Sequence, residues 1–260
     1  MDARTTLSDW RDGELVALDD CEVVEQTLDV ADSFLVDDGR VLALGLHRSR
    51  FLDSVREQGF RDRAVVERFW DAAVASIPRT GAWFPRFELA TIRDAHRLRF
   101  RLRPAPPLTD SVVLATADGD PRRVPDIKGP DIAQLSVLRQ RAQQVGADEA
   151  VILDNGLISD GTTTALLWWR DDTLATPPLT FAKVDSVAAR TVRGVAAALR
   201  IPVDEEAVTP ADLEGTVVWA VNALHGIRAV RSWVDGPQLA QDAARTTAWR
   251  TRLAALAREV

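Results

Sequence analysis

The stretch from Lys128 to Pro178 constrains the fold most, because regular elements follow one another in it with little space between them. Lys128 precedes Gly129-Pro130, and apolar residues at helical spacing then predict a helix that ends near Gly146. The predicted buried side of this helix consists of Ile132, Leu135, Leu138, Ala142 and Val145. The short apolar runs AVILD, ALLWW and TLATPP after it predict strands. Helices alternating with such strands indicate an α/β fold.

The N-terminal part shows the same mixture of elements. Residues 14–44 predict strands, with SFLV and RVLAL on either side of Asp38-Gly39, a dipeptide suited to a tight hairpin turn. Helices are expected at 47–55 and 62–77. In the second helix Val66, Phe69, Ala73 and Ile77 recur at helical spacing. This part therefore forms its own small α/β unit.

A strand is also expected at HRLRFRLR, where arginines alternate with apolar residues. The alternation places Arg97, Arg99, Arg101 and Arg103 on one face of the strand. Such a row could attract an anionic substrate, but a solvated face paired with nearby carboxylates is the favoured interpretation. The Pro-rich segment 103–110 that follows is the best linker candidate. The chain is therefore expected to divide into an N-terminal domain, 1–105, and a C-terminal domain, 110–260.

The second domain continues after the linker with a strand at SVVLAT. Beyond Pro178 we expect a helix at 184–199 and two strands, VVWAVNAL and IRAVRSWV. A final helix from Pro237 is predicted to present Trp249, Leu253, Leu256 and Val260 on one face.

Composition excludes several classes of function. A net charge of −7 argues against binding a nucleic acid, because little here would neutralise a phosphate backbone. No apolar run reaches the ~18 residues that a membrane span needs, so no membrane partner is expected. The single cysteine, Cys21, cannot form an internal disulfide, and a cytoplasmic location is the simplest expectation. No metal site is expected.

The basic residues are unevenly chosen. Of 32, only Lys128 and Lys183 are lysines, and the other 30 are arginines. An amine can lose its proton and form an imine, which a guanidinium cannot, so a chain with almost no lysine can retain one for chemistry. Compositional drift that left two surface lysines is the competing interpretation.

The order of these elements resembles the class IV, or fold type IV, pyridoxal-phosphate enzymes. This family includes branched-chain aminotransferases, D-amino acid aminotransferases and aminodeoxychorismate lyases. The resemblance covers about residues 33–234, and it rests on Lys128, the helix after it, GADEAVILD, NGLISDG and the hairpin ending in TPP. It implies a two-domain fold with pyridoxal 5′-phosphate at the domain interface, and a homodimer.

The resemblance also implies roles for individual residues. Lys128 would carry the cofactor covalently and move the proton at the substrate Cα. Asp160 stands where the family has the glutamate that pairs with the cofactor's ring nitrogen. Arg50, in the family's H-x-x-R segment that starts at His47, would bind the cofactor phosphate. Lys183 matches no motif, so we expect it to be a solvated surface residue.

Two further phosphate-binding elements match the family less well. The family's G-I-T-R helix start corresponds to Ser186, Val187, Ala188 and Ala189, whose backbone N–H groups can still bind phosphate. Asn222 and Ala223, in VNAL, resemble the C-N-A-L segment of the lyases and are expected near the phosphate. His225 could line the pocket, but a structural histidine is the favoured interpretation.

Other departures bear on the substrate. The Y-G-D-G-x-F-E-T signature is replaced by LDVADSFLV, and the chain contains no tyrosine. Together with VNAL, the short chain and a Lys128 to Asp154 spacing one residue shorter than in aminotransferases, this favours an aminodeoxychorismate lyase. Such an enzyme converts the small-molecule amino substrate 4-amino-4-deoxychorismate to 4-aminobenzoate and pyruvate, as in folate biosynthesis. Arg93 or Arg97 would bind its carboxylates.

Two alternatives stay open. The first is an aminotransferase acting on branched-chain or D-amino acids with 2-oxoglutarate. The second is a degenerate family member that serves as a binding or scaffold protein, which the missing glycines suggest and the retained Lys128 opposes.

Overall fold

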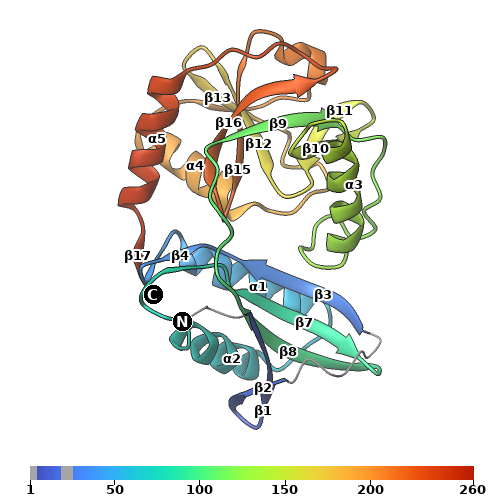
Figure 1. Cartoon of the computed structure of the whole chain (residues 1–260), viewed down its shortest axis with the longest axis vertical. Helices are drawn as coiled ribbons and strands as arrows, with labels where there is room; N and C mark the ends of the chain where they lie inside the picture. Colours follow the sequence, from blue (N-terminus) through green and yellow to red (C-terminus); the bar gives the residue numbers. More distant parts are fainter. Residues whose placement is uncertain (1–4, 19–25) are drawn as a thin grey trace. The chain divides into compact units, whose positions relative to one another are not determined.

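The computed structural model describes residues 5–18 and 26–260, so Cys21 lies outside the described residues. The chain divides into two compact units (Figure 1). The N-terminal unit contains Met1–Leu108, Ile127–Pro130 and Leu256–Val260, and the C-terminal unit contains Thr109–Asp126 and Asp131–Ala255. The long segment of the N-terminal unit ends within the predicted linker, and the segment that carries Lys128 belongs to the same unit.

The N-terminal unit is built on a five-stranded antiparallel sheet of order β2-β1-β8-β7-β3. Its strands are β1 (Thr6–Arg11), β2 (Glu14–Ala17), β3 (Gln26–Ser33), β7 (Arg86–Ile92) and β8 (Ala95–Leu102). Helix α1 (Leu44–Glu57) packs against β3, and α2 (Arg63–Ala75) packs against β2 and β8. Helix α2 lies where the apolar periodicity predicts it, and α1 includes the helix expected at 47–55 and extends beyond it at both ends. The buried rings of Trp70 and Phe87 stack 4.1 Å apart between helix and sheet.

A small second sheet of this unit has the order β17-β5-β4-β6. Its strands are β4 (Val36–Asp37), β5 (Arg40–Val41), β6 (Ala82–Trp83) and β17 (Arg258–Glu259). The β4–β5 hairpin is confirmed, with positive φ at both Asp38 and Gly39, as a tight primed turn requires. The predicted final helix from Pro237 is wrong at both ends, because α5 begins at Ala243 and the chain leaves it after Ala255, where Arg258 pairs with Val41 on β5.

The arginine row on β8 is only partly solvated. Arg97 is exposed, whereas Arg99 is buried and lies 3.5 Å from Asp9 and in hydrogen-bonding contact with Gln26. Arg101 pairs with Glu88 at 3.3 Å. Pairing with carboxylates is confirmed, but a solvated face is wrong at Arg99, because groups from β1 and β3 cover its side chain.

The C-terminal unit contains an eight-stranded mixed sheet of order β11-β10-β9-β16-β15-β12-β13-β14 (Figure 1). Its strands are β9 (Ser111–Thr116), β10 (Glu149–Asp154), β11 (Leu157–Gly161), β12 (Ala165–Arg170), β13 (Thr173–Thr176), β14 (Val203–Glu205), β15 (Val217–Asn222) and β16 (Gly226–Val234). Strand β9 runs parallel to β10 and β16, and β13 runs parallel to β14. The other neighbours are antiparallel.

Three helices and a short 3-10 turn complete this unit. They are α3 (Ile132–Gln144), α4 (Val187–Ala198), α5 (Ala243–Ala255) and the turn Pro210–Leu213. Side chains of β9 alternate, so that Val112 and Leu114 enter one core while Val113 and Ala115 face α3. Val145, predicted to be buried, is 58% exposed because α3 ends at Gln144, just before the reversal at Gly146. Within the described residues, no helix is both long enough and apolar enough to cross a membrane.

Candidate active site

Lys128 belongs to a short segment that is fixed to β3 in the N-terminal unit. The N–H of Ala31 donates to the carbonyl oxygen of Lys128 at 2.6 Å. Gly129 follows with φ of +146°, and a Cβ built there would lie 2.8 Å from Cα of Val30. A glycine is therefore required after the lysine, because any side chain would push the segment away from β3.

The same unit holds a buried group of charges on β3 and α1. Asp32, 1% exposed, accepts hydrogen bonds from Nδ1 of His47 at 2.7 Å and from Nε of Arg50 at 2.8 Å. Burial alone would raise the pKa of Asp32, but the charges of Arg50 and His47 lower it to about 2. Asp32 therefore stays ionised and orients Arg50, the predicted phosphate-binding residue.

Asp160 lies on β11 in the C-terminal unit. One of its carboxylate oxygens accepts the N–H of Gly161 at 3.0 Å, and the other lies 3.7 Å from Nη1 of Arg122. The Arg122 side chain is 4% exposed. Burial would lower the pKa of Arg122, but its bond to Asp120 and the charges around it raise that pKa. A permanent cation therefore lies beside Asp160.

A buried network supports the turn that follows Asp160. Glu149, fully buried on β10, accepts hydrogen bonds from Oγ1 of Thr162 at 2.6 Å, from N of Thr163 at 3.1 Å and from the Thr163 hydroxyl. Arg228 on β16, itself 2% exposed, donates to the same carboxylate at 3.2 Å. The network connects β10, β16 and the turn after β11, and so fixes the backbone just beyond Asp160.

The predicted phosphate-binding elements are two structured turns of the C-terminal unit. Ser186 is the N-cap of α4, and its hydroxyl accepts the N–H of Ala189 at 3.2 Å. The helix begins at Val187, so the N–H groups of Val187 and Ala188 belong to its first turn, where no partner within the helix exists. Asn222 bonds to Thr163 and to the backbone at 224–225, so it shapes the turn that contains Ala223.

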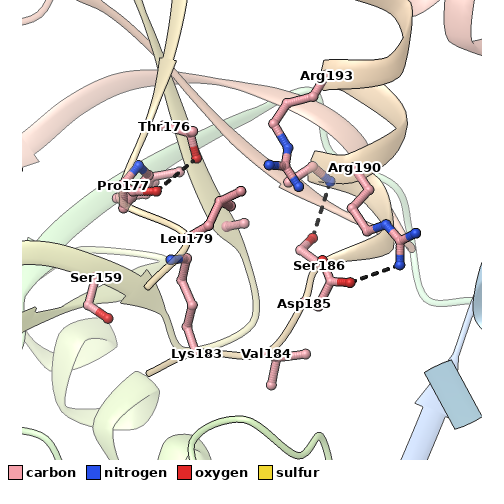
Figure 2. Close-up of a pocket in the computed structure, with 13 residues that line it drawn as sticks. Ser159, Thr176, Pro177, Leu179, Lys183, Val184, Asp185, Ser186, Arg190 and Arg193 are labelled. Atoms are coloured by element: carbon pink, nitrogen blue, oxygen red, sulfur yellow. Dashed lines mark hydrogen bonds and ion pairs between the residues drawn. The ribbon is translucent and has the colours of Figure 1, made fainter. Parts of the chain in front are cut away.

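A pocket of about 290 Å³ opens within the C-terminal unit (Figure 2). Its walls come from β11, β12, the end of β13, the loop 177–186 and α4. Lys183 lines it, half-buried, with its ammonium group donating to the carbonyl oxygen of Pro178. The expectation that Lys183 is a solvated surface residue is wrong, because its side chain is half-buried in the wall of the pocket and its ammonium group is bonded to Pro178.

The other predicted site residues are not among those that line the pocket. Arg93 is exposed in the turn between β7 and β8, and Arg97 is exposed on β8. Nδ1 of His225 accepts the N–H of Thr109 at 3.2 Å, and His225 is not among the residues that line the pocket described above. Within the described part of the chain, no group of three or more metal-binding side chains is present.

Sequence reasoning missed Asp32, Arg122 and Glu149. Each is joined to its partner across the fold, with Glu149 and Arg228 separated by 79 positions and Arg122 brought to Asp160 by an irregular loop. The sequence signal available was the position of Asp32 shortly before the His47–Arg50 segment, since a carboxylate that becomes buried needs a partner.

The family of the chain follows from a comparison with protein families. The model of the family described as amino-transferase class IV matches residues 29–233, which include both Lys128 and Asp160. The chain belongs to the class IV aminotransferase family. Class IV aminotransferases are pyridoxal-phosphate enzymes of fold type IV, so the predicted fold and family are confirmed. No curated protein matches the chain by sequence.

Solved structures of class IV proteins resemble the chain over nearly its whole length. The branched-chain amino acid aminotransferase from Escherichia coli has a TM-score of 0.82 at 19% identity, covering 98% of this chain and 94% of that one. A hypothetical aminotransferase from Mycobacterium tuberculosis, in its PLP-bound form, has 0.80 at 19%, covering 97% and 98%. A protein from Legionella pneumophila, provisionally named 4-amino-4-deoxychorismate lyase, has 0.76 at 16%, covering 90% and 91%.

Proposed function

We propose that this class IV chain binds pyridoxal 5′-phosphate and converts 4-amino-4-deoxychorismate to 4-aminobenzoate and pyruvate. One observation supports the enzymatic part above all: the segment with Lys128 is fixed to β3 by a 2.6 Å hydrogen bond and a glycine that no other residue can replace. These contacts fix the backbone at Lys128, which is one of only two lysines in the chain.

The residues fit the cofactor chemically, as their surroundings indicate. Lys128 supplies the amine that would hold it. Asp160, 13% exposed and beside Arg122, is a carboxylate suited to a protonated ring nitrogen. Arg50, oriented by Asp32, and the first N–H groups of α4 suit a phosphate group. When bound, pyridoxal 5′-phosphate supplies an electron-withdrawing ring for reactions at the substrate Cα.

The chain's own residues then have distinct tasks. Nζ of Lys128 takes the proton from the substrate Cα, which requires its neutral form. Nη1 of Arg122 lies 3.7 Å from the Asp160 carboxylate, so a positive charge adjoins the group proposed to face the ring nitrogen. Arg93 and Arg97, both exposed, are the cations we propose for the two carboxylates of the substrate. Loss of pyruvate from the substrate leaves an aromatic ring, which favours the forward direction.

An aminotransferase is the alternative, and the likeness to the Escherichia coli and Mycobacterium tuberculosis structures favours it. Against it, the chain lacks tyrosine and carries VNAL at the β15–β16 turn. Purified protein is given 4-amino-4-deoxychorismate without any keto acid. Pyruvate and 4-aminobenzoate in equal amounts support the lyase, whereas turnover of branched-chain or D-amino acids that depends strictly on 2-oxoglutarate contradicts it.

Cofactor attachment is tested separately, by reduction with borohydride. Protein incubated with pyridoxal 5′-phosphate is reduced, digested and examined by mass spectrometry. We expect the modified peptide to contain Lys128. Lys128→Ala should remove the adduct and the visible absorbance, while Lys183→Ala, the matched variant of the other lysine, should keep both. An adduct on Lys183 alone, or none at all, contradicts the proposal and would favour a scaffold protein.

We further propose that the enzyme is a homodimer, as the family resemblance implies. Size-exclusion chromatography with light scattering should give twice the chain mass of 28.6 kDa. A species of one chain mass at micromolar concentration contradicts this.

A further inference from the structure

The pocket of the C-terminal unit adjoins the start of α4, which is predicted to bind the cofactor phosphate. It shares Ser186 and Ala189 with that helix start, whereas Asp160, Val187, Ala188, Asn222 and Ala223 are not among its lining residues. Its volume of about 290 Å³ is at the low end for ligand sites, so its occupant would be a small molecule.

The lining carries more positive than negative charge. Lys183, Arg190 and Arg193 line the pocket together with one acid, Asp185, which pairs with Arg190 at 2.8 Å. Arg193 reaches from α4 and Lys183 from the loop, from opposite sides of the pocket (Figure 2). Within the described residues Arg193 forms no ion pair, whereas Lys183 donates to the carbonyl oxygen of Pro178 and has the acids Asp160 and Glu205 nearby.

Unsatisfied polar atoms point to a missing partner in the same pocket. Ser159 is 1% exposed, and its hydroxyl has no hydrogen-bond partner within the described residues. Nε of Arg193 is also buried without a partner. An unpaired buried donor costs about 1–3 kcal/mol, more for a charged one, so native structures rarely leave two such groups beside one cavity. Carboxylate or phosphate oxygens accept from a guanidinium, an ammonium and a hydroxyl at once.

We propose that this pocket binds a small molecule through a carboxylate or phosphate group, held by Lys183, Arg193 and Ser159. Lys128 and Asp160, the residues proposed to hold the cofactor's reactive parts, are not among the residues that line this pocket. Burial lowers the pKa of Lys183, and the nearby acids Asp160 and Glu205 act in the opposite direction. A bound anion adds to the effect of these acids and keeps the ammonium charged.

Calorimetry with the full-length protein tests the site. Inorganic phosphate and succinate are titrated separately at constant ionic strength, with and without saturating pyridoxal 5′-phosphate. At least one of them should bind saturably under both conditions. Lys183→Gln and Arg193→Gln should each weaken binding about tenfold or more, since each removes a charge-assisted hydrogen bond. Ser159→Ala should weaken it less. Arg252→Gln, which removes an exposed arginine of α5 away from the pocket, should leave affinity unchanged.

NMR of the two lysines in the wild-type protein is a second measurement of binding, and a variant is needed only to assign the signals. Protein labelled with ¹³C at Cε of lysine gives two signals, which Lys183→Gln assigns. Adding the anion should shift the Lys183 signal and spare that of Lys128. No saturable binding, equal affinity in all variants, or an unshifted Lys183 signal overturns the proposal. Binding abolished by pyridoxal 5′-phosphate also overturns it, because the anion would then occupy the cofactor's phosphate site. The titrations without cofactor stand even if the proposed catalytic function fails.

Discussion

Asp32 shows how a single residue can set both stability and site geometry. Asp32→Asn leaves Arg50 and His47 without their buried counter-charge, and breaking such a pair costs about 3–5 kcal/mol. The pKa of Asp32 is lowered from 3.8 to about 2, so the unfolded chain takes up the proton first as the pH falls. The stabilisation is therefore complete above pH about 4 and is lost towards pH 2.

Urea unfolding between pH 6 and pH 2.5 measures this effect. The stability difference between wild type and Asp32→Asn should narrow below pH 4. Asp53→Asn, which removes an exposed acid of α1, is the control and should change stability little. A difference that stays constant down to pH 2.5 would show that the Asp32 charge is not what stabilises the fold.

His225, unlike Asp32, is a residue whose shifted pKa makes folding less favourable at acidic pH. Burial and the positive charge of Arg228 lower its pKa to about 4. The unfolded chain then binds the proton first as the pH falls from about 6.5 to about 4, so this residue makes folding less favourable over that range. An NMR titration should show one ring titrating near pH 4, and the spectrum of His225→Gln should lack it. Titration of that ring above pH 6 would contradict the prediction.

At the scale of elements, the contact between β3 and the segment 127–130 is the one on which the proposed chemistry depends. Gly129→Ala places a methyl group 2.8 Å from Val30 Cα at a positive φ, which costs about 1–3 kcal/mol of strain or displaces the segment. We expect a lower melting temperature and slower trapping of Lys128 by cofactor and borohydride. Gly119→Ala meets no atom within 4 Å and is the matched control. Equal trapping rates in the two variants would show that the contact does not position the lysine.

Elements with a periodic apolar pattern could be predicted from the sequence, and elements held by distant pairing could not. The helices α1, α2 and α3 follow from local spacing, as does the β4–β5 turn at Asp38-Gly39. Strand β17 has no such pattern, since its two residues are exposed and only hydrogen bonds to β5 define it. Lys183 likewise has no local signal, because it lies on a loop whose backbone bonds to Asp126, 57 positions away in the sequence. Motif spacing identified candidate residues of the site, but not the network around Glu149 that supports them.

At the scale of the whole molecule, the chain passes between the two units more than once. The N-terminal unit takes up three separate segments, so the chain leaves it at Leu108, returns for Ile127–Pro130, and returns again at Leu256. Neither unit is therefore one continuous piece of sequence. The N-terminal unit, which contains the residue proposed to hold the cofactor, therefore depends on two segments that come after the C-terminal unit has begun.

The last five residues allow this dependence to be tested. A chain that stops after Ala255 loses the pairing of Arg258 and Glu259 with β5, and also the bonds from Arg40 to Ala257 and from Val260 to Gly39. Hydrogen exchange should become faster at Arg40 and Val41 but not in β9 or β15, since the core of the C-terminal unit keeps every strand. The double substitution Arg258→Ala, Glu259→Ala keeps the backbone pairing and should leave exchange at β5 nearly unchanged. Unaltered protection of β5 in the shortened chain would show that β17 is dispensable and that the N-terminal unit holds together without the end of the chain.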